Sequence, residues 1–178
     1  MTSFAPVYIV MGVTGCGKST VAHAIAKDCA FKMIDADDYH TLEAKELMAD
    51  GIGLTDRQRI PWLARVCQAI RLTLKEHKGV VVACSALKGS YRDIFRDSFE
   101  SCFFIWLKID SEVVCERLES RHGHFAKSNL IQSQFNDLEI PDSESSVFVF
   151  DANQNKTDLL PLISNTVTTH FQTQKDYN

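Results

Sequence analysis

The amino-acid sequence predicts an α/β fold built on a parallel β-sheet. Short runs of apolar residues recur along the 178-residue chain, and segments with helical spacing of apolar residues separate them. An apolar run without polar alternation is typical of a strand buried on both faces, as in a parallel sheet. A glycine-rich turn joins the first run to the first helical segment, which is the arrangement that α/β proteins use to bind phosphate.

The elements follow one another in a regular order along the chain. Strands are expected at 7–11, 31–34, 80–84, 103–107 and 147–150. After the glycine-rich turn, apolar residues from Val21 to Ala26 have helical spacing, and a helix over 41–50 should end at Gly51. Thr55 and Gln58 suit a capping box for a helix reaching position 77, although Pro61 is also a suitable first-turn residue. Further helices are expected at 112–119 and at the C-terminus.

Composition limits the classes of function. The formal net charge is −4 at pH 7, which argues against a general nucleic-acid binder. No segment approaches the ~20 apolar residues that a membrane helix needs, and the N-terminus does not resemble a secretory signal. The six cysteines lack the spacing of a zinc site and are expected to be reduced and mostly buried, as in a cytoplasmic protein. One domain is expected to span residues 1–178.

Residues 12–19 match the phosphate-binding pattern G-x-x-x-x-G-K-[ST] in full. Its glycines allow the backbone to approach phosphate closely, and consecutive N–H groups then form an anion nest. Lys18 can reach the β- and γ-phosphates of a nucleotide, and the Ser19 hydroxyl can bind Mg²⁺. The expected nucleotide contacts are therefore Gly12, Val13, Thr14, Gly15, Cys16, Gly17, Lys18, Ser19 and Thr20. Cys16 has two interpretations, a tolerated small side chain or a redox-sensitive thiol.

An acidic segment follows the second expected strand. Because ligands of open α/β sheets bind at the carboxyl ends of strands, Asp35 and Asp37 should face the nucleotide. If the segment is extended, both side chains lie on the same side, where one can hold a metal-bound water and the other can accept a hydroxyl proton. The alternative is a solvated turn that caps the next helix, a role that suits Asp38.

Two pairs of cationic residues have i, i+4 spacing. Lys88 and Arg92 follow the third expected strand and suit an anionic group, or else form a solvated basic face. Arg117 and Arg121 precede a polar segment, 121–145, which is expected to be a mobile lid. Arginine can stack on adenine or bind phosphates, although an exposed helix face is the alternative. His122 and His124 in the lid have no partner with zinc spacing.

Taken together, these segments resemble the small P-loop gluconokinases, which are relatives of the shikimate and nucleoside-monophosphate kinases. The similarity covers about residues 8–151. The phosphate loop is shared by many proteins, whereas the later segments are far more particular. The matching segments are MGVTGCGKST at 11–20, DADDYH at 35–40, DRQRIPWL at 56–63, ACSALKGSYRD at 83–93, GHF at 123–125 and SQFNDLEIP at 133–141.

The resemblance implies a reaction in which ATP and D-gluconate give ADP and 6-phosphogluconate, with Mg²⁺. It also implies a five-stranded sheet of order 2-3-1-4-5, a lid that closes over ATP and a homodimer. By motif position, it implies that Lys18, Asp37 and Arg121 are catalytic, with Asp37 as the base. It places Ser19 and Asp35 near the metal, Arg117 and Arg121 on the nucleotide, and Asp37, His40, Arg59, Lys88 and Arg92 on the sugar acid.

The chain departs from the family pattern mainly on the acceptor side. The departures include Thr41, Ala44, Leu47 and Gly53. Two alternatives therefore stay open: a kinase for another small acid, polyol or nucleoside monophosphate, and a nucleotide-binding regulatory protein without phosphotransfer. The pair of aspartates and the arginines near the lid speak against the second.

Overall fold

The computed structural model describes residues 5–122 and 128–176, and side chains for all of these except 121, 122 and 128. Its centre is a five-stranded sheet in which every pairing is parallel and the strand order is β2-β3-β1-β4-β5. This order confirms the expected topology. The strands are β1 (Val7–Met11), β2 (Lys32–Asp35), β3 (Val80–Ala83), β4 (Cys102–Lys108) and β5 (Val147–Asp151).

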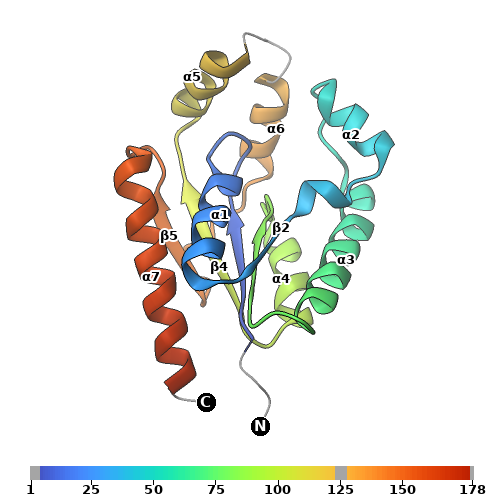
Figure 1. Cartoon of the computed structure of the whole chain (residues 1–178). Coiled ribbons are helices and arrows are strands. Elements are labelled where there is room, and N and C mark those ends of the chain that lie inside the picture. Colours follow the sequence, from blue (N-terminus) through green and yellow to red (C-terminus); the bar gives the residue numbers. More distant parts are fainter. Residues whose placement is uncertain (1–4, 123–127, 177–178) are drawn as a thin grey trace.

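Helices cover both faces of the sheet (Figure 1). On one face α1 packs against α7, and on the other α3 packs against α4. The remaining helices, α2, α5 and α6, lie beyond the carboxyl ends of the strands, at the top of Figure 1. The helices are α1 (Lys18–Cys29), α2 (Leu42–Ala49), α3 (Asp56–Thr73), α4 (Gly89–Ser98), α5 (Ser111–His122), α6 (Ser128–Asp137) and α7 (Lys156–Asp176).

The apolar run of β1 is buried along its whole length. Successive side chains point to opposite faces of a strand, so Tyr8 and Val10 join the core under α1 and α7, whereas Ile9 and Met11 join the core under α3 and α4. Two cores meeting on one strand explain why the sequence of β1 lacks polar alternation. The strand therefore holds its carboxyl end, where the glycine-rich turn begins, in a fixed position.

Two helices differ from expectation. Helix α3 begins at Asp56 behind the Thr55–Gln58 capping box, so Pro61 lies inside the helix and the alternative start at Pro61 is wrong. Helix α6 lies within the segment that was expected only to be polar. Its Ile131 is buried in the core shared with α1, and Phe135 packs against that core. These apolar contacts explain why part of a polar segment is helical.

Candidate active site

The glycine-rich turn between β1 and α1 has the backbone geometry of a phosphate cradle. Gly12 and Gly17 have φ angles of 141° and 109°, values that residues with a Cβ rarely adopt. A Cβ on Gly12 would also lie 2.9 Å from Cys16 Sγ and 3.0 Å from the Leu107 carbonyl oxygen. Lys18 begins α1, and its Nζ donates a hydrogen bond to the Val13 carbonyl (3.0 Å), which holds the ammonium over the loop.

Ser19, Asp35 and Asp37 form a connected oxygen cluster beside the loop. The Ser19 hydroxyl donates to Asp35 Oδ2 (3.0 Å), and the Asp37 N–H donates to Asp35 Oδ1 (3.1 Å). Hydroxyl and carboxylate oxygens are ligands that Mg²⁺ accepts, usually with one or two carboxylates, water and phosphate completing the shell. In the described ranges no group of three or more His, Cys, Asp or Glu side chains is arranged to hold a metal.

The expected route by which Asp37 reaches the site is wrong. The chain is not extended after Asp35, because residues Ala36–Tyr39 form a 3₁₀ turn that the Asp35 side chain caps. Asp37 nevertheless lines the same cleft as Lys18. Most of its side chain is open to solvent, yet packing around its carboxyl raises the pKa of Asp37, and Asp35 and Asp38 add to the rise while Lys18 opposes it.

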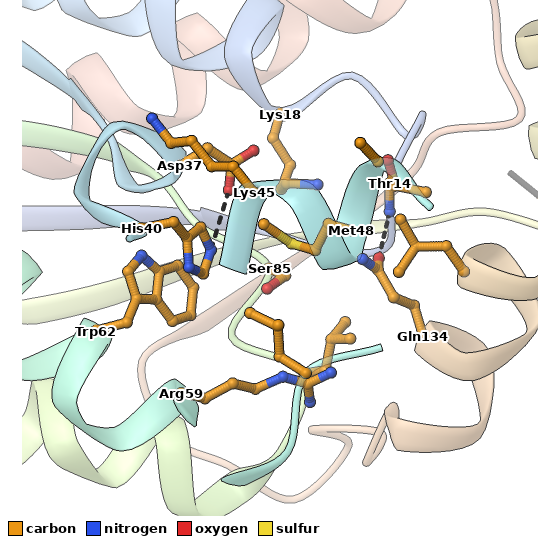
Figure 2. A pocket seen from close by; sticks show the side chains of 14 residues that line it. Thr14, Lys18, Asp37, His40, Lys45, Met48, Arg59, Trp62, Ser85 and Gln134 are labelled. Carbon is orange, nitrogen blue, oxygen red and sulfur yellow. Dashed lines mark hydrogen bonds and ion pairs between the residues drawn. The ribbon is translucent and has the colours of Figure 1, made fainter. Parts of the chain in front are cut away.

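A cleft of about 410 Å³ connects these groups to α2, α3 and α6, and we call it the central cleft. Figure 2 shows Lys18 and Thr14 at one side of it, Asp37 and His40 at another, and Arg59 across from the loop. Its volume is in the range of small-molecule sites. The lining residues are Thr14, Lys18, Asp37, His40, Lys45, Met48, Ala49, Leu54, Arg59, Trp62, Ser85, Leu87, Leu130 and Gln134.

His40 is buried and stacks on Trp62, with ring centroids 4.1 Å apart and an interplanar angle of 13°. Burial, reinforced by the cations Arg65, Lys45 and Arg59, lowers the pKa of His40 to about 4. Its Nε2 lies 3.8 Å from Asp37 Oδ1, while Nδ1 is buried with no hydrogen-bond partner among the residues that the structure describes. We therefore assign the proton to Nε2 and leave Nδ1 unprotonated, because a buried Nδ1–H without an acceptor would cost about 1–3 kcal/mol.

The far wall of the central cleft carries paired cations. Arg59 donates to Asp137 Oδ2 (2.7 Å) and to the Tyr91 hydroxyl (3.3 Å). Lys88 does not line the cleft, because its Nζ donates to Asp56 Oδ1 (2.8 Å) and lies 3.9 Å from Asp137 Oδ1. Arg59 and Lys88 therefore share Asp137, and Arg59 is the one that reaches the cleft.

The structure does not bring Arg92 into the cleft. Its side chain is 1% exposed and its Nε donates to Glu144 Oε2 (2.8 Å). The rest of the guanidinium donates to the carbonyls of Ala86, Leu87 and Glu139 at 2.9–3.0 Å. The i, i+4 spacing predicted that Lys88 and Arg92 share one helix face. The carbonyls of Ala86 and Leu87 and the carboxylate of Glu144, 52 residues away, instead hold Arg92 in the interior.

Arg117, one of the two arginines expected to contact nucleotide, does not line the central cleft. Arg117 donates to the carbonyls of Ala152 (2.8 Å) and Gln154 (3.4 Å). It lines a small hollow together with Gly17 and Thr20. Arg121 lies in the last turn of α5, and its side chain is outside the described residues, as are the side chains of His122 and His124.

All six cysteines lie in the described ranges and are free, and five of them are buried. Cys16 packs beneath Gly12, and burial raises the pKa of its thiol. A buried thiol with a raised pKa is a poor target for oxidation, so the structure favours the interpretation of Cys16 as a tolerated small side chain. Within the described ranges, the helices are too short or too polar to cross a membrane.

Several cleft residues escaped the sequence analysis. Lys45 lies outside the matching segments, whereas Trp62 lies in DRQRIPWL and Gln134 in SQFNDLEIP, although neither was expected in the site. The expected lid, 121–145, includes residues 123–127, which lie outside the description. From α6 onward, hydrogen bonds join the same segment to the rest of the protein. The Thr14 N–H of the glycine-rich turn donates to Gln134 Oε1 (2.6 Å), and the Gly89 N–H of α4 donates to Glu139 Oε2 (2.6 Å). Whether this segment moves stays a prediction.

Known proteins of similar sequence are kinases. Residues 14–158 match the family described as "Shikimate kinase". A thermoresistant gluconokinase of Escherichia coli strain K12 is 38% identical over 149 residues, covering 83% of this chain and 85% of that protein. A gluconokinase of Arabidopsis thaliana is 37% identical over 151 residues, covering 78% and 80%.

Solved structures show the same fold. The crystal structure of a gluconokinase from Sinorhizobium meliloti 1021 superimposes with a TM-score of 0.83 at 36% identity, covering 96% of this chain and 98% of that one. A shikimate kinase from Bacteroides thetaiotaomicron has a TM-score of 0.60 at 13% identity, covering 94% and 98%. At that identity, the second match supports the fold alone.

Removal of the Glu144 carboxylate should lower stability, because Arg92 would remain charged and buried without its counter-ion. We expect Glu144→Ala to lower the free energy of unfolding by about 2–4 kcal/mol in urea denaturation. Glu144→Gln keeps an acceptor oxygen, so its free energy of unfolding should fall less. Asp142→Ala changes an exposed neighbour, so its free energy of unfolding should change little. An unchanged free energy of unfolding in Glu144→Ala would contradict the interior role of Arg92.

His40 should make the fold sensitive to mild acid. Between pH 6.5 and about 4 the unfolded chain binds a proton at His40 that the folded chain does not, so the free energy of unfolding falls as pH falls. The full loss is about 3 kcal/mol. Urea titrations across this range should show that the free energy of unfolding of His40→Gln falls less than that of the original protein. His77→Gln, at an exposed histidine, should lose as much as the original protein. Equal losses in all three proteins would refute a buried neutral His40.

Proposed function

This chain belongs to the shikimate kinase family, among its gluconokinases, and from that premise we propose how it transfers the γ-phosphate of ATP to D-gluconate. The products are ADP and 6-phosphogluconate. The observation that carries the proposal is the central cleft, which holds Lys18 of the phosphate loop, the carboxylate of Asp37 and the guanidinium of Arg59 in one cavity. A phosphate donor, a hydroxyl group and an anionic group of the acceptor therefore each have a partner there.

The nucleotide end of the site is formed by residues 12–20. Backbone N–H groups of the loop and the N-terminus of α1 bind the phosphates, and Lys18 stabilises charge on the transferring group. Ser19 and Asp35 would hold Mg²⁺, which in phosphoryl transfer neutralises charge on the β- and γ-oxygens. Arg117 and the adjoining hollow serve the nucleoside side of ATP, and Arg121 is assigned to the same end by motif position.

Asp37 is assigned as the general base. It accepts the proton of the gluconate C6 hydroxyl as that oxygen attacks the γ-phosphate. The raised pKa of Asp37 makes the carboxylate a stronger base than an ordinary aspartate. The Nε2–H of the neutral His40 lies 3.8 Å from the Asp37 carboxylate, on the same side of the cleft.

Arg59 is assigned to the gluconate carboxylate. A guanidinium matches a carboxylate with two parallel hydrogen bonds, and Arg59 presents its charge to the cleft from a buried position on α3. Its present partner, Asp137, would be replaced or joined by the acceptor. Lys88 adds positive charge behind Arg59, whereas Arg92 supports the wall from inside.

An ADP-release assay with gluconate, related aldonates, shikimate and nucleoside monophosphates tests the acceptor. We expect turnover with gluconate to exceed turnover with each other acceptor. Turnover with another acid but not with gluconate would identify a different sugar-acid kinase. Binding of ATP without turnover of any acceptor would show a nucleotide-binding protein without phosphotransfer.

Loss of the base should lower the rate without preventing ATP binding. We expect Asp37→Asn to reduce kcat by about 10²–10⁴, the usual contribution of a positioned base. Asp38→Asn, at an exposed carboxylate of the same turn, is the matched control and should retain most activity. Near-normal kcat in Asp37→Asn would remove Asp37 from the mechanism.

The pH profile gives an independent check of Asp37. Because a base must be ionised, kcat/KM should fall on the acid side with an apparent pKa above the usual aspartate value of about 3.9. The residual activity of Asp37→Asn should lack this acid limb. The same limb in both proteins would mean that another group titrates.

Lys18→Ala should lower kcat because charge on the transferring phosphoryl group loses its nearest cation. We expect a loss of about 10²–10³, the size found for removal of one preorganised electrostatic group. Lys45→Ala, which removes an exposed cation across the same cleft, is the control, and its kcat should fall much less. Comparable losses in both variants would mean that Lys18 contributes only general positive charge.

A further inference from the structure

We propose that Gln134 occupies the phosphate loop as a competitor of the nucleotide, and that its displacement couples nucleotide binding to acceptor binding through α6. The nucleotide part stands on the geometry of the loop alone. The acceptor part rests on the proposed function, because it assigns the acceptor's carboxylate to Arg59.

The contact between α6 and the loop occupies a backbone N–H of the glycine-rich turn. The backbone N–H of Thr14 donates to Gln134 Oε1 at 2.6 Å, across 120 residues of chain (Figure 2). Thr14 lies between Gly12 and Lys18, in the segment whose N–H groups form the anion nest. A neutral carboxamide oxygen is a weaker acceptor than a phosphate oxygen, which carries charge. A bound nucleotide therefore displaces Gln134, and the free energy needed to break that hydrogen bond lowers the affinity for the nucleotide.

The same helix also holds the acceptor end of the cleft. Asp137 lies three residues after Gln134, so the two side chains share one face of α6. Asp137 Oδ2 accepts from Arg59 Nη1 at 2.7 Å, and this ion pair occupies the guanidinium that faces the cleft. One helix thus bonds to the nucleotide loop through Gln134 and to the acceptor wall through Asp137.

The end of α6 is anchored to the body of the protein. The Glu139 N–H donates to the Leu87 carbonyl (2.9 Å), and the Gly89 N–H donates to Glu139 Oε2. Leu87 itself lines the cleft. Because an α-helix transmits displacement along its length, release of Gln134 shifts Asp137 against these anchors and weakens its hold on Arg59. The Arg59 guanidinium then becomes available to an anionic acceptor.

The consequence is positive coupling between the two ligands. A ligand that breaks the Gln134 contact raises the affinity of the other, and linkage requires the effect to be reciprocal. The coupling cannot exceed the free energy of the contact that is broken. For one net hydrogen bond this corresponds to a factor of about 2 to 12 in affinity.

The first experiment measures nucleotide binding alone. Isothermal titration with a non-hydrolysable ATP analogue and Mg²⁺, without acceptor, should show tighter binding by Gln134→Ala than by the original protein, by about 2- to 12-fold. Gln132→Ala is the matched control, because Gln132 is exposed on the same helix and bonds to Asn136. Its affinity should be unchanged. Equal or weaker binding by Gln134→Ala would overturn the proposal, since weaker binding would make Gln134 a ligand of the nucleotide.

The second experiment measures the coupling. Gluconate is titrated with and without the saturating analogue, and the ratio of the two dissociation constants is compared between proteins. The original protein and Gln132→Ala should bind gluconate more tightly with the analogue, whereas the ratio in Gln134→Ala should approach one. An unchanged ratio in Gln134→Ala would overturn the coupling. If the original protein binds no gluconate, the proposed function fails, and the first experiment alone decides whether Gln134 competes with nucleotide.

Discussion

The active site depends on one constraint, the parallel alignment of β2, β3 and β1, which brings three carboxyl ends to the same edge of the sheet. Strand β3 lies between the other two, and the Gly12 N–H donates to the Ser85 carbonyl just after it. The phosphate loop is therefore fixed to its neighbour as well as to β1. Only across this edge can Ser19 of α1 meet Asp35 of β2, residues that are 16 positions apart.

On the far wall of the cleft and in the interior behind it, carboxylates hold the buried and half-buried cations Arg59, Lys88, Arg92 and Arg96. Arg59 and Lys88 share Asp137, and Lys88 also contacts Asp56. Arg92 and Arg96 share Glu144. Such pairs contribute little net stability, because desolvation offsets their attraction, but they fix geometry. Under the proposed function the pairing on the far wall also matters for binding, since the acceptor's carboxylate would compete with Asp137 for Arg59.

The two ends of the cleft differ in how they are built. The nucleotide end is local, formed by a continuous turn and the first residues of α1. The acceptor end is assembled from a 3₁₀ turn, α2, α3 and α6, whose side chains meet only through packing, as in the stack of His40 on Trp62. Gly53 belongs to this second part, because a Cβ there would lie 2.5 Å from Ser133 Oγ of α6. This departure from the family pattern allows α6 to approach the loop between α2 and α3 closely.

The sequence by itself determined the sheet, its strands and the phosphate loop, because burial on both faces and the conformational demands of Gly12 and Gly17 act over a few neighbouring residues. It also placed Asp35 beside Ser19, since strand ends converge in any parallel sheet. Only the tertiary structure decided that Asp37 lies in a 3₁₀ turn, that Arg92 is interior and that Gln134 reaches the loop. The partners of Arg92 and Gln134 lie 52 and 120 residues away, and packing of whole helices rather than local spacing determines which side chains meet over such separations.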